Sequence, residues 1–232
     1  MPTALIPTGM ACGVLLTAAG LALWGSFRKT SRFIHAVRAV RWLAGALLLL
    51  GTLFAWQGNL PASTTYLILM TALAAPPGRR HYPHWGNALS ILPVLVLVGA
   101  SLLWRTNLAR VETEASDLPT AAIELAIVVC GGLGAQALNQ NLGESTAPPQ
   151  RTGRPALLTA ATYTLLTLLL SSTALINLWQ RGSVWRRATY EGGLAGAWLA
   201  WSAVWASPRH PRWLRTVLMI AATLILVVLA AR

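Results

Sequence analysis

Long apolar runs separated by short arginine-rich stretches dominate this chain. A helix that crosses a bilayer needs about 20 mostly apolar residues. The runs that approach this length predict about eight crossings, at residues 4–25, 40–56, 61–75, 85–104, 118–138, 155–179, 192–207 and 214–231. We therefore expect an all-α integral membrane protein, a bundle of about eight transmembrane helices that forms one polytopic domain over residues 1–232.

The composition supports this fold class and excludes others. Of the 232 residues, 55% are hydrophobic and only 10% are charged, against about a quarter in an ordinary soluble domain. Apolar residues are too frequent for a disordered basic tail, and two cysteines, Cys12 and Cys130, are too few for a disulfide scaffold. The net charge of +12 lies between apolar runs rather than on one face, so we expect the lipid bilayer as a partner and no nucleic acid.

The connections between the runs predict the orientation. Every second connection, starting with the first, is rich in basic residues: Arg28, Lys29, Arg32, His35, Arg38 and Arg41, then Arg79, Arg80, His81 and His84, then Arg151 and Arg154, then Arg209, His210, Arg212 and Arg215. Basic loops favour the cytoplasmic side. Both termini are then expected outside, in a bacterial-type inner membrane. The first run has no basic residue before it, unlike a signal peptide, and is interpreted as a retained helix.

Tryptophan positions agree with these boundaries. An indole prefers the membrane interface, where the ring is buried and its N–H stays hydrated. The tryptophans expected at the ends of crossings are Trp24, Trp42, Trp56, Trp85, Trp104, Trp179 and Trp213. We interpret them as an aromatic belt.

Few side chains suggest chemistry. Glu124 is the one carboxylate well inside a predicted crossing, and such a group is a functional hypothesis by default. It is a structural, hydrogen-bonded or water-facing group, or the centre of a small transporter or membrane enzyme. Gln136, Asn139 and Asn177 could add polar contacts near the ends of crossings. There is no catalytic triad, metal cluster or phosphate loop, so a non-enzymatic role is favoured over an enzyme.

Small residues and tryptophans predict close helix packing. Gly131, Gly132, Gly134 and Ala135 form one small-residue face, and Gly192, Gly193 and Gly196 form another. Such faces let helices approach closely. Trp198, Trp201 and Trp205 are spaced three and four apart, and so share a helix face. That face packs against other helices, or it meets a flat cofactor, lipid or a partner subunit.

The segment from Leu175 to the end of the chain resembles the end of the cytochrome c assembly protein family (the CcsA type). That family has an outer segment of the form G-x-Y-W-x-W-D-P-K-E-T-W, followed by a crossing with a tryptophan, a basic inner loop and a last crossing. Gly182, Trp185, Glu191 and Trp198 match this pattern in an alignment without gaps. The resemblance implies a haem-facing surface formed by Trp185, Arg186, Arg187, Glu191, Trp198 and Trp201.

The same segment departs from the family where haem is bound. Arg187 and Ala188 stand where the family has tryptophan and aspartate, and Thr120, Ala121 and Ala122 stand where its first outer histidine is expected. Haem iron needs a protein ligand. The chain is therefore expected to be a divergent member without metal ligands, which would hold haem only at an interface with a partner.

These features predict a non-enzymatic membrane subunit that assists or scaffolds a haem- or cytochrome-containing complex. Its expected partners are other membrane subunits, a c-type cytochrome or its assembly factors. An active haem-handling component of cytochrome c maturation, with ligands from a partner, is the alternative within the same resemblance. A transporter or membrane enzyme that uses Glu124 is the alternative outside it.

Overall fold

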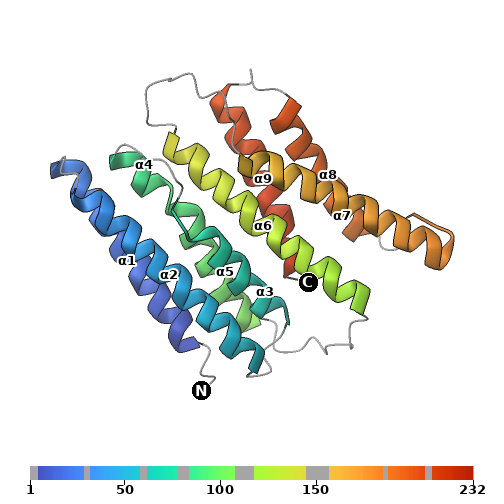
Figure 1. Ribbon diagram of the computed structural model, residues 1–232, viewed down its shortest axis with the longest axis horizontal. Coiled ribbons are helices and arrows are strands. Elements are labelled where there is room, and N and C mark those ends of the chain that lie inside the picture. Colours follow the sequence, from blue (N-terminus) through green and yellow to red (C-terminus); the bar gives the residue numbers. More distant parts are fainter. Residues whose placement is uncertain are drawn as a thin grey trace.

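The computed structural model describes residues 5–28, 32–57, 62–77, 84–107, 118–144, 157–184, 188–206 and 211–231. The regular structure in these ranges is helical, which confirms the all-α expectation (Figure 1). The helices are α1 (Leu5–Arg28), α2 (Arg32–Gln57), α3 (Ala62–Ala74), α4 (His84–Leu89), α5 (Leu92–Asn107), α6 (Leu118–Glu144), α7 (Leu157–Arg181), α8 (Ala188–Ala206) and α9 (Arg212–Ala230).

The helices lie side by side, and successive helices run in alternating directions, except that α5 continues in the direction of the short α4 (Figure 1). Helix α6 lies in the middle, where it contacts α3, α5, α7 and α9. The α1–α2 hairpin lies on one side of it, and α7 and α8 lie on the other. Asn139 of α6 bonds to the carbonyl of Ala74 in α3, and Asn141 bonds to Thr216 in α9. The C-terminal ends of α3 and α6 and the N-terminal end of α9 therefore lie at the same end of the bundle.

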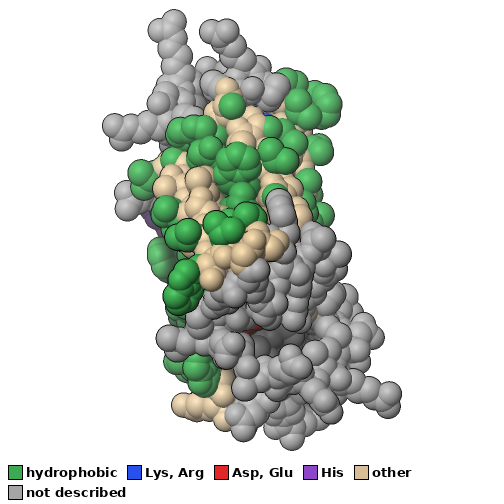
Figure 2. Space-filling model, turned by 90° about the vertical axis from the view of Figure 1, so that its right-hand side faces the viewer, with side chains coloured by type: hydrophobic (Ala, Val, Ile, Leu, Met, Phe, Trp, Pro, Cys, Tyr) green, Lys and Arg blue, Asp and Glu red, His purple; other side chains and the backbone are tan. Residues whose placement is uncertain are grey.

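Five of the described helices, α1, α2, α6, α7 and α9, are long and apolar enough to cross a membrane. The surface agrees with this. Hydrophobic side chains cover much of the described part of the face that Figure 2 shows, and large apolar residues such as Leu53, Leu157 and Trp179 are strongly exposed. Burial in lipid is the environment that stabilises such a surface, so we treat the chain as a multi-pass membrane protein.

The predicted crossing at residues 85–104 is wrong as a single helix, because the structure divides it into α4 and α5. The break lies at Ser90 and Ile91, just before Pro93. Proline has no backbone N–H, and its ring clashes with the carbonyl four residues earlier. The carbonyl of Leu89 therefore cannot receive the helical hydrogen bond from residue 93, and the regular i to i+4 ladder resumes with the bond from Leu95 N to Ile91 O.

Helix α2 also starts earlier than expected, at Arg32 rather than at residue 40. His35, Arg38 and Arg41 were expected in a loop, but they lie on the first turns of this helix. A charged residue ends an apolar run without ending a helix, since arginine is a good helix former. The extra turns carry the helix beyond the expected apolar segment.

The aromatic belt is compatible with the structure where the side chains are described. Trp24, Trp42, Trp56, Trp179 and Trp213 are each more than half exposed. Four of them lie within a few residues of a helix end, and Trp42 lies farther in because α2 begins early. The side chains of Trp85 and Trp104 lie outside the described residues.

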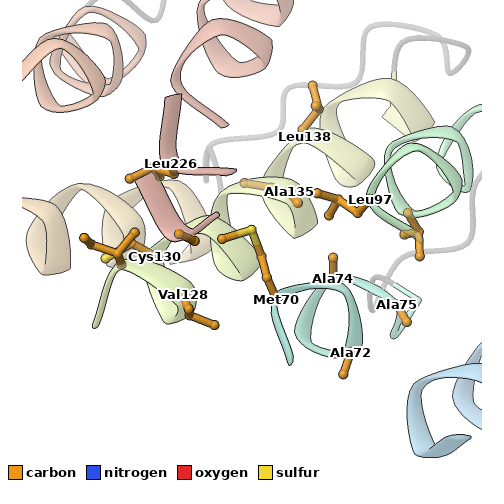
Figure 3. Close-up of a cluster of buried hydrophobic side chains, with 14 of the residues drawn as sticks. Met70, Ala72, Ala74, Ala75, Leu97, Val128, Cys130, Ala135, Leu138 and Leu226 are labelled. Carbon is orange, nitrogen blue, oxygen red and sulfur yellow. The ribbon is translucent and has the colours of Figure 1, made fainter. Parts of the chain in front are cut away.

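Helices α3 and α6 approach closely at two glycines of α6. Met70 extends from α3 toward α6, where Gly131 has no side chain (Figure 3). A Cβ added at Gly132 would lie 2.6 Å from the Cβ of Leu73 and 3.2 Å from the carbonyl oxygen of Met70. The predicted small-residue face on α6 is therefore a helix-packing surface. On α8, Gly193 and Gly196 face Leu229 and Ile225 of α9, whereas Gly192 faces open space.

Candidate functional site

The α7–α8 hairpin contains the residues that match the cytochrome c assembly pattern. Helix α7 ends at Arg181, and Gly182 follows with a φ of 68°. This left-handed conformation favours glycine and ends the helix, and the N–H of Gly182 bonds to Leu178 O at 2.8 Å. The matched glycine thus has a backbone role. The predicted site residues Trp185, Arg186 and Arg187 lie outside the described residues.

Glu191 lies in the first turn of α8 and is buried, with 4% of its surface exposed. The side-chain amide of Asn177, from the last turns of α7, donates from Nδ2 to Glu191 Oε1 at 2.9 Å. The same nitrogen donates to Val184 O at 3.3 Å. A helix N-terminus also favours a negative charge. Glu191 and Asn177 therefore fasten the two helices and the described start of the loop between them.

We expect Asn177→Leu to lower the free energy of unfolding by about 2 kcal/mol, because it leaves the buried Glu191 carboxyl without this donor. Thermal unfolding followed by tryptophan fluorescence in detergent measures the loss. Ser172→Leu, on the exposed side of the same helix, is the matched control and should change little. Equal melting temperatures for the two variants would show that the Asn177 bond is unimportant.

Trp198 connects α8 to the middle of α7. Its indole Nε1 donates to Thr167 Oγ1 at 2.9 Å, and its ring stacks on Tyr163 with centroids 6.2 Å apart. Trp205 stacks on Tyr163 at the same centroid distance. Two of the three tryptophans on the predicted face therefore pack on one tyrosine of α7.

Replacing Thr167 with valine should destabilise the hairpin by about 1 kcal/mol, because the partly buried indole N–H of Trp198 loses its acceptor. Thr162→Val on the same helix is the control. The hydroxyl of Thr162 bonds only to a carbonyl of its own helix, Leu158 O, among the bonds that are resolved. A larger loss for Thr162→Val than for Thr167→Val, measured by thermal unfolding, would contradict this role of Trp198.

Trp201, the third tryptophan of that face, is completely buried. Its Cζ2 atom lies 3.2 Å from the position that a Cβ on Gly134 of α6 would occupy, with Thr223 Oγ1 of α9 and Thr162 Cγ2 of α7 close to the same point. Gly134 thus makes room for the indole. Within the described part of the chain its N–H has no hydrogen-bond partner. Trp201 fills the space between α6, α7 and α9.

The described members of the predicted haem-facing set lie against other helices. Glu191, Trp198 and Trp201 contact α7 or the bundle interior rather than a common open surface. The described residues also contain no group of three or more His, Cys, Asp or Glu side chains that could hold a metal. Cys130 is buried in the hydrophobic core and Cys12 is half-buried, and both are free thiols.

Glu124 has a definite partner across the α3–α6 interface. Tyr66 of α3 donates its hydroxyl to Glu124 Oε2 at 3.0 Å, and both side chains are half-buried. The phenol supplies the Glu124 carboxyl with a hydrogen-bond donor inside the helix bundle, where lipid would supply none. Glu124 is thus a hydrogen-bonded group that joins two helices, as the structural alternative expects.

Arg41, which was expected in a loop, is a buried cation with several hydrogen-bond partners. Arg41 is 1% exposed. Its guanidinium donates from Nε to Ala75 O at 3.0 Å, from Nη1 to Ser90 Oγ at 2.8 Å and from Nη2 to Pro76 O at 3.4 Å. Asn139 of α6 donates to the adjacent carbonyl of Ala74 at 2.9 Å. We call this group of residues (Arg41, Ala74, Ala75, Pro76, Ser90 and Asn139) the α3-end junction.

The α3-end junction explains how a helix of 13 residues ends inside the protein. The last carbonyls of a helix have no intrahelical partner, and lipid offers none. Arg41 and Asn139 supply donors to three successive carbonyls, and a cation is favoured at the negative end of the helix dipole. Prolines in the sequence mark both of the chain segments that meet at the junction. Pro76 and Pro77 follow the end of α3, and Pro93 follows Ser90 at the break between α4 and α5.

Comparisons with known proteins do not identify a family. No family model matches the chain, and searches of curated proteins and of solved structures found no match. The similarity to the cytochrome c assembly family therefore remains a prediction from the residues of the α7–α8 segment.

Proposed function

We propose that this chain is a non-enzymatic integral membrane subunit with a cytochrome c assembly-like fold, which scaffolds a haem- or cytochrome-containing membrane complex. The observation that carries the proposal is that Glu191 and Trp198 form hydrogen bonds with α7. Both match the family pattern, and both bind α7 rather than an open surface. A member that keeps the residues fastening the hairpin, but lacks the outer histidines, is suited to scaffolding.

The proposed topology has eight crossings, with α4 and α5 together forming one. The basic connections face the cytoplasm, and both termini lie outside a bacterial-type inner membrane. The connection between α7 and α8 then lies on the outer side. We propose that its residues Trp185, Arg186 and Arg187 contact the partner, because arginine side chains suit acidic groups such as haem propionates or an acidic cytochrome.

Co-purification tests this function directly. The tagged chain is extracted from its native membrane in mild detergent, and the associated proteins and the visible absorption spectrum are recorded. We expect membrane subunits that carry haem, or c-type cytochromes, to co-purify. A variant with Arg186→Gln and Arg187→Gln should lose these partners, whereas Arg212→Gln, at the opposite end of the bundle, should retain them.

Two outcomes would overturn the scaffold proposal. Stoichiometric haem with a bis-histidine spectrum in the isolated chain would make it a haem-binding protein in its own right. Co-purification of membrane proteins without any haem protein would remove the link to cytochromes. The active haem-handling alternative is tested by gene deletion, since intact cytochrome c maturation in the deletion strain would exclude it.

The Glu124 alternative has one specific observation in its favour, the bond from Tyr66 across α3 and α6. Glu124→Gln removes the charge but keeps an acceptor oxygen for Tyr66, so the fold should be retained. Loss of solute or proton transport in reconstituted vesicles, with an unchanged melting temperature, would support a transporter. Unchanged complex formation and the absence of transport in both forms would count against it.

A further inference from the structure

Helices α6 to α9 form a ring around one tryptophan. Helix α6 contacts α7 and α9, and α8 contacts the same two helices. Trp201 of α8 extends into the middle of this ring and reaches Gly134 of α6. Both residues are buried, and the indole has no exposed surface. The second half of the bundle therefore closes around an aromatic side chain that carries a polar N–H.

The indole N–H of Trp201 has no hydrogen-bond partner in the described part of the chain. A buried donor that gives up its bond to solvent without gaining another costs about 1–3 kcal/mol, and nearly all buried polar groups in proteins are paired. On the same helix, Trp198 has an acceptor in Thr167 Oγ1 at 2.9 Å. The N–H of Trp201 therefore points to an acceptor that the described side chains do not supply.

The missing side chain of Gly134 provides a position for such an acceptor. The Cβ that glycine lacks would lie 3.2 Å from Trp201 Cζ2, 3.5 Å from Thr223 Oγ1 and 3.8 Å from Thr162 Cγ2. Because Cζ2 and Nε1 are bonded to the same ring carbon, the N–H edge of the indole borders this position. These van der Waals distances on three sides fit about one non-hydrogen atom. The three nearest side chains are uncharged, which disfavours an ion.

Thr223 of α9 offers a second partner at the same position. Its hydroxyl donates to Met219 O of its own helix at 2.7 Å, so its proton is used, while its oxygen can still accept a hydrogen bond. A ligand between Trp201 and Thr223 must therefore accept one hydrogen bond and donate another. Water does both, and a buried water requires two to four polar partners.

We propose that a buried water molecule binds beside Gly134, between α6, α8 and α9. It accepts a hydrogen bond from Trp201 Nε1 and donates one to Thr223 Oγ1. The water thus joins α8 to α9 against the backbone of α6 and satisfies a donor in the apolar interior. This site is independent of the proposed scaffold function, because it stabilises the fold and contacts no partner.

Nuclear magnetic resonance of the indole N–H groups tests the site. The purified chain, with its 11 tryptophans labelled with nitrogen-15, is studied in detergent micelles, and Trp201→Phe identifies the signal of Trp201. We expect a dipolar cross-peak between this N–H and the water resonance. Thr223→Val should weaken the cross-peak at least about twofold, because the water loses one of its partners.

Thr173→Val is the matched control for Thr223→Val. Thr173 is also buried, and its hydroxyl also bonds within its own helix, to Leu169 O at 2.8 Å. It lies about 16 Å along α7 from Thr162. This substitution should leave the water cross-peak of Trp201 unchanged.

Two substitutions at Gly134 separate the hydrogen bond from packing. Gly134→Ala and Gly134→Ser add the same Cβ, which displaces the water and demands the same small shift of the Trp201 indole. The serine hydroxyl can accept from the indole N–H in place of the water, whereas alanine cannot. Both variants should lose the water cross-peak. Gly134→Ser should melt at the higher temperature, although alanine is the better helix former.

Each measurement can overturn the site. A resolved Trp201 signal without a water cross-peak in the unmodified protein would exclude a long-lived water. A cross-peak that is as strong in Thr223→Val as in Thr173→Val would show that Thr223 does not hold the water. A higher melting temperature for Gly134→Ala than for Gly134→Ser would show that the indole needs no acceptor. If neither Gly134 variant folds, the first two measurements decide the question. The scaffold function is tested separately, by the proteins and haem that co-purify.

Discussion

Arg41→Ala is expected to lower the free energy of unfolding by at least about 3 kcal/mol, since each buried polar group left unpaired costs about 1–3 kcal/mol. The substitution removes the donors to Ala75 O, Pro76 O and Ser90 Oγ in the α3-end junction. Thermal unfolding in detergent, followed through the fluorescence of the 11 tryptophans, measures the effect. Arg212→Ala, an exposed arginine, is the control and should unfold like the unmodified protein.

Two further measurements distinguish the role of the guanidinium from that of charge alone. Arg41→Lys should be intermediate, because an ammonium keeps the charge but lacks the planar fork of donors. Guanidinium ions at millimolar concentration should raise the melting temperature of Arg41→Ala and leave the unmodified protein unchanged. If Arg41→Ala melts at the same temperature as Arg212→Ala in the absence of guanidinium, the junction does not stabilise the protein. If added guanidinium does not raise the melting temperature of Arg41→Ala, the guanidinium group is not what stabilises the junction.

Gly132→Leu should prevent α3 from docking on α6, with a loss larger than the roughly 1–3 kcal/mol typical of an overpacked core. Even a single added Cβ would meet the Cβ of Leu73 at 2.6 Å and the backbone oxygen of Met70 at 3.2 Å. Neither atom is the mobile end of a side chain, so the whole of α3 would have to shift. The yield of monodisperse protein in size-exclusion chromatography and the melting temperature are the readouts.

The neighbouring glycine provides a graded comparison. At Gly131 the atoms that a Cβ would meet first are Cε and Sδ of Met70, the flexible end of an unbranched side chain. Gly131→Ala should therefore be milder than Gly132→Ala. Gly192→Leu, with nothing within 4 Å of its Cβ position, should be tolerated. The reverse order for the two alanine variants would show that side-chain flexibility does not determine the cost.

The apolar runs predicted the helical class and the approximate place of most helices, because burial in lipid demands long apolar segments. The ends were less predictable. Arg38 and Arg41 interrupt the apolar run at the start of α2, yet the helix continues through them. Pro93 lies within residues 85–104, which were predicted as one crossing, because an apolar run does not reveal whether a proline bends a helix or divides it.

The contacts of the candidate site could not be predicted from the sequence, because they join residues that are far apart along the chain. Arg41 bonds to Ser90 and Ala75 only because α2, α3 and α4 pack together. In the sequence it was therefore assigned to the first basic connection, with the other arginines there. Trp198, Trp201 and Trp205 share a helix face in sequence, but Gly134 admits only Trp201 to the interior, whereas the other two stack on Tyr163. Asn177 was recognised as a polar residue near a helix end, but its bond to Glu191 was not foreseen.

The α3-end junction also has a consequence for biosynthesis. Arg41 precedes its acceptor Ala75 by 34 residues, and Asn139 follows its acceptor Ala74 by 65 residues. During translation the end of α3 can therefore meet the arginine early, but it must wait for α6 before the amide of Asn139 arrives. Until then one carbonyl and the faces of Met70 and Leu73 lack their final partners. The newly made first half of the chain is thus an incomplete intermediate, whose completion depends on the arrival of α6.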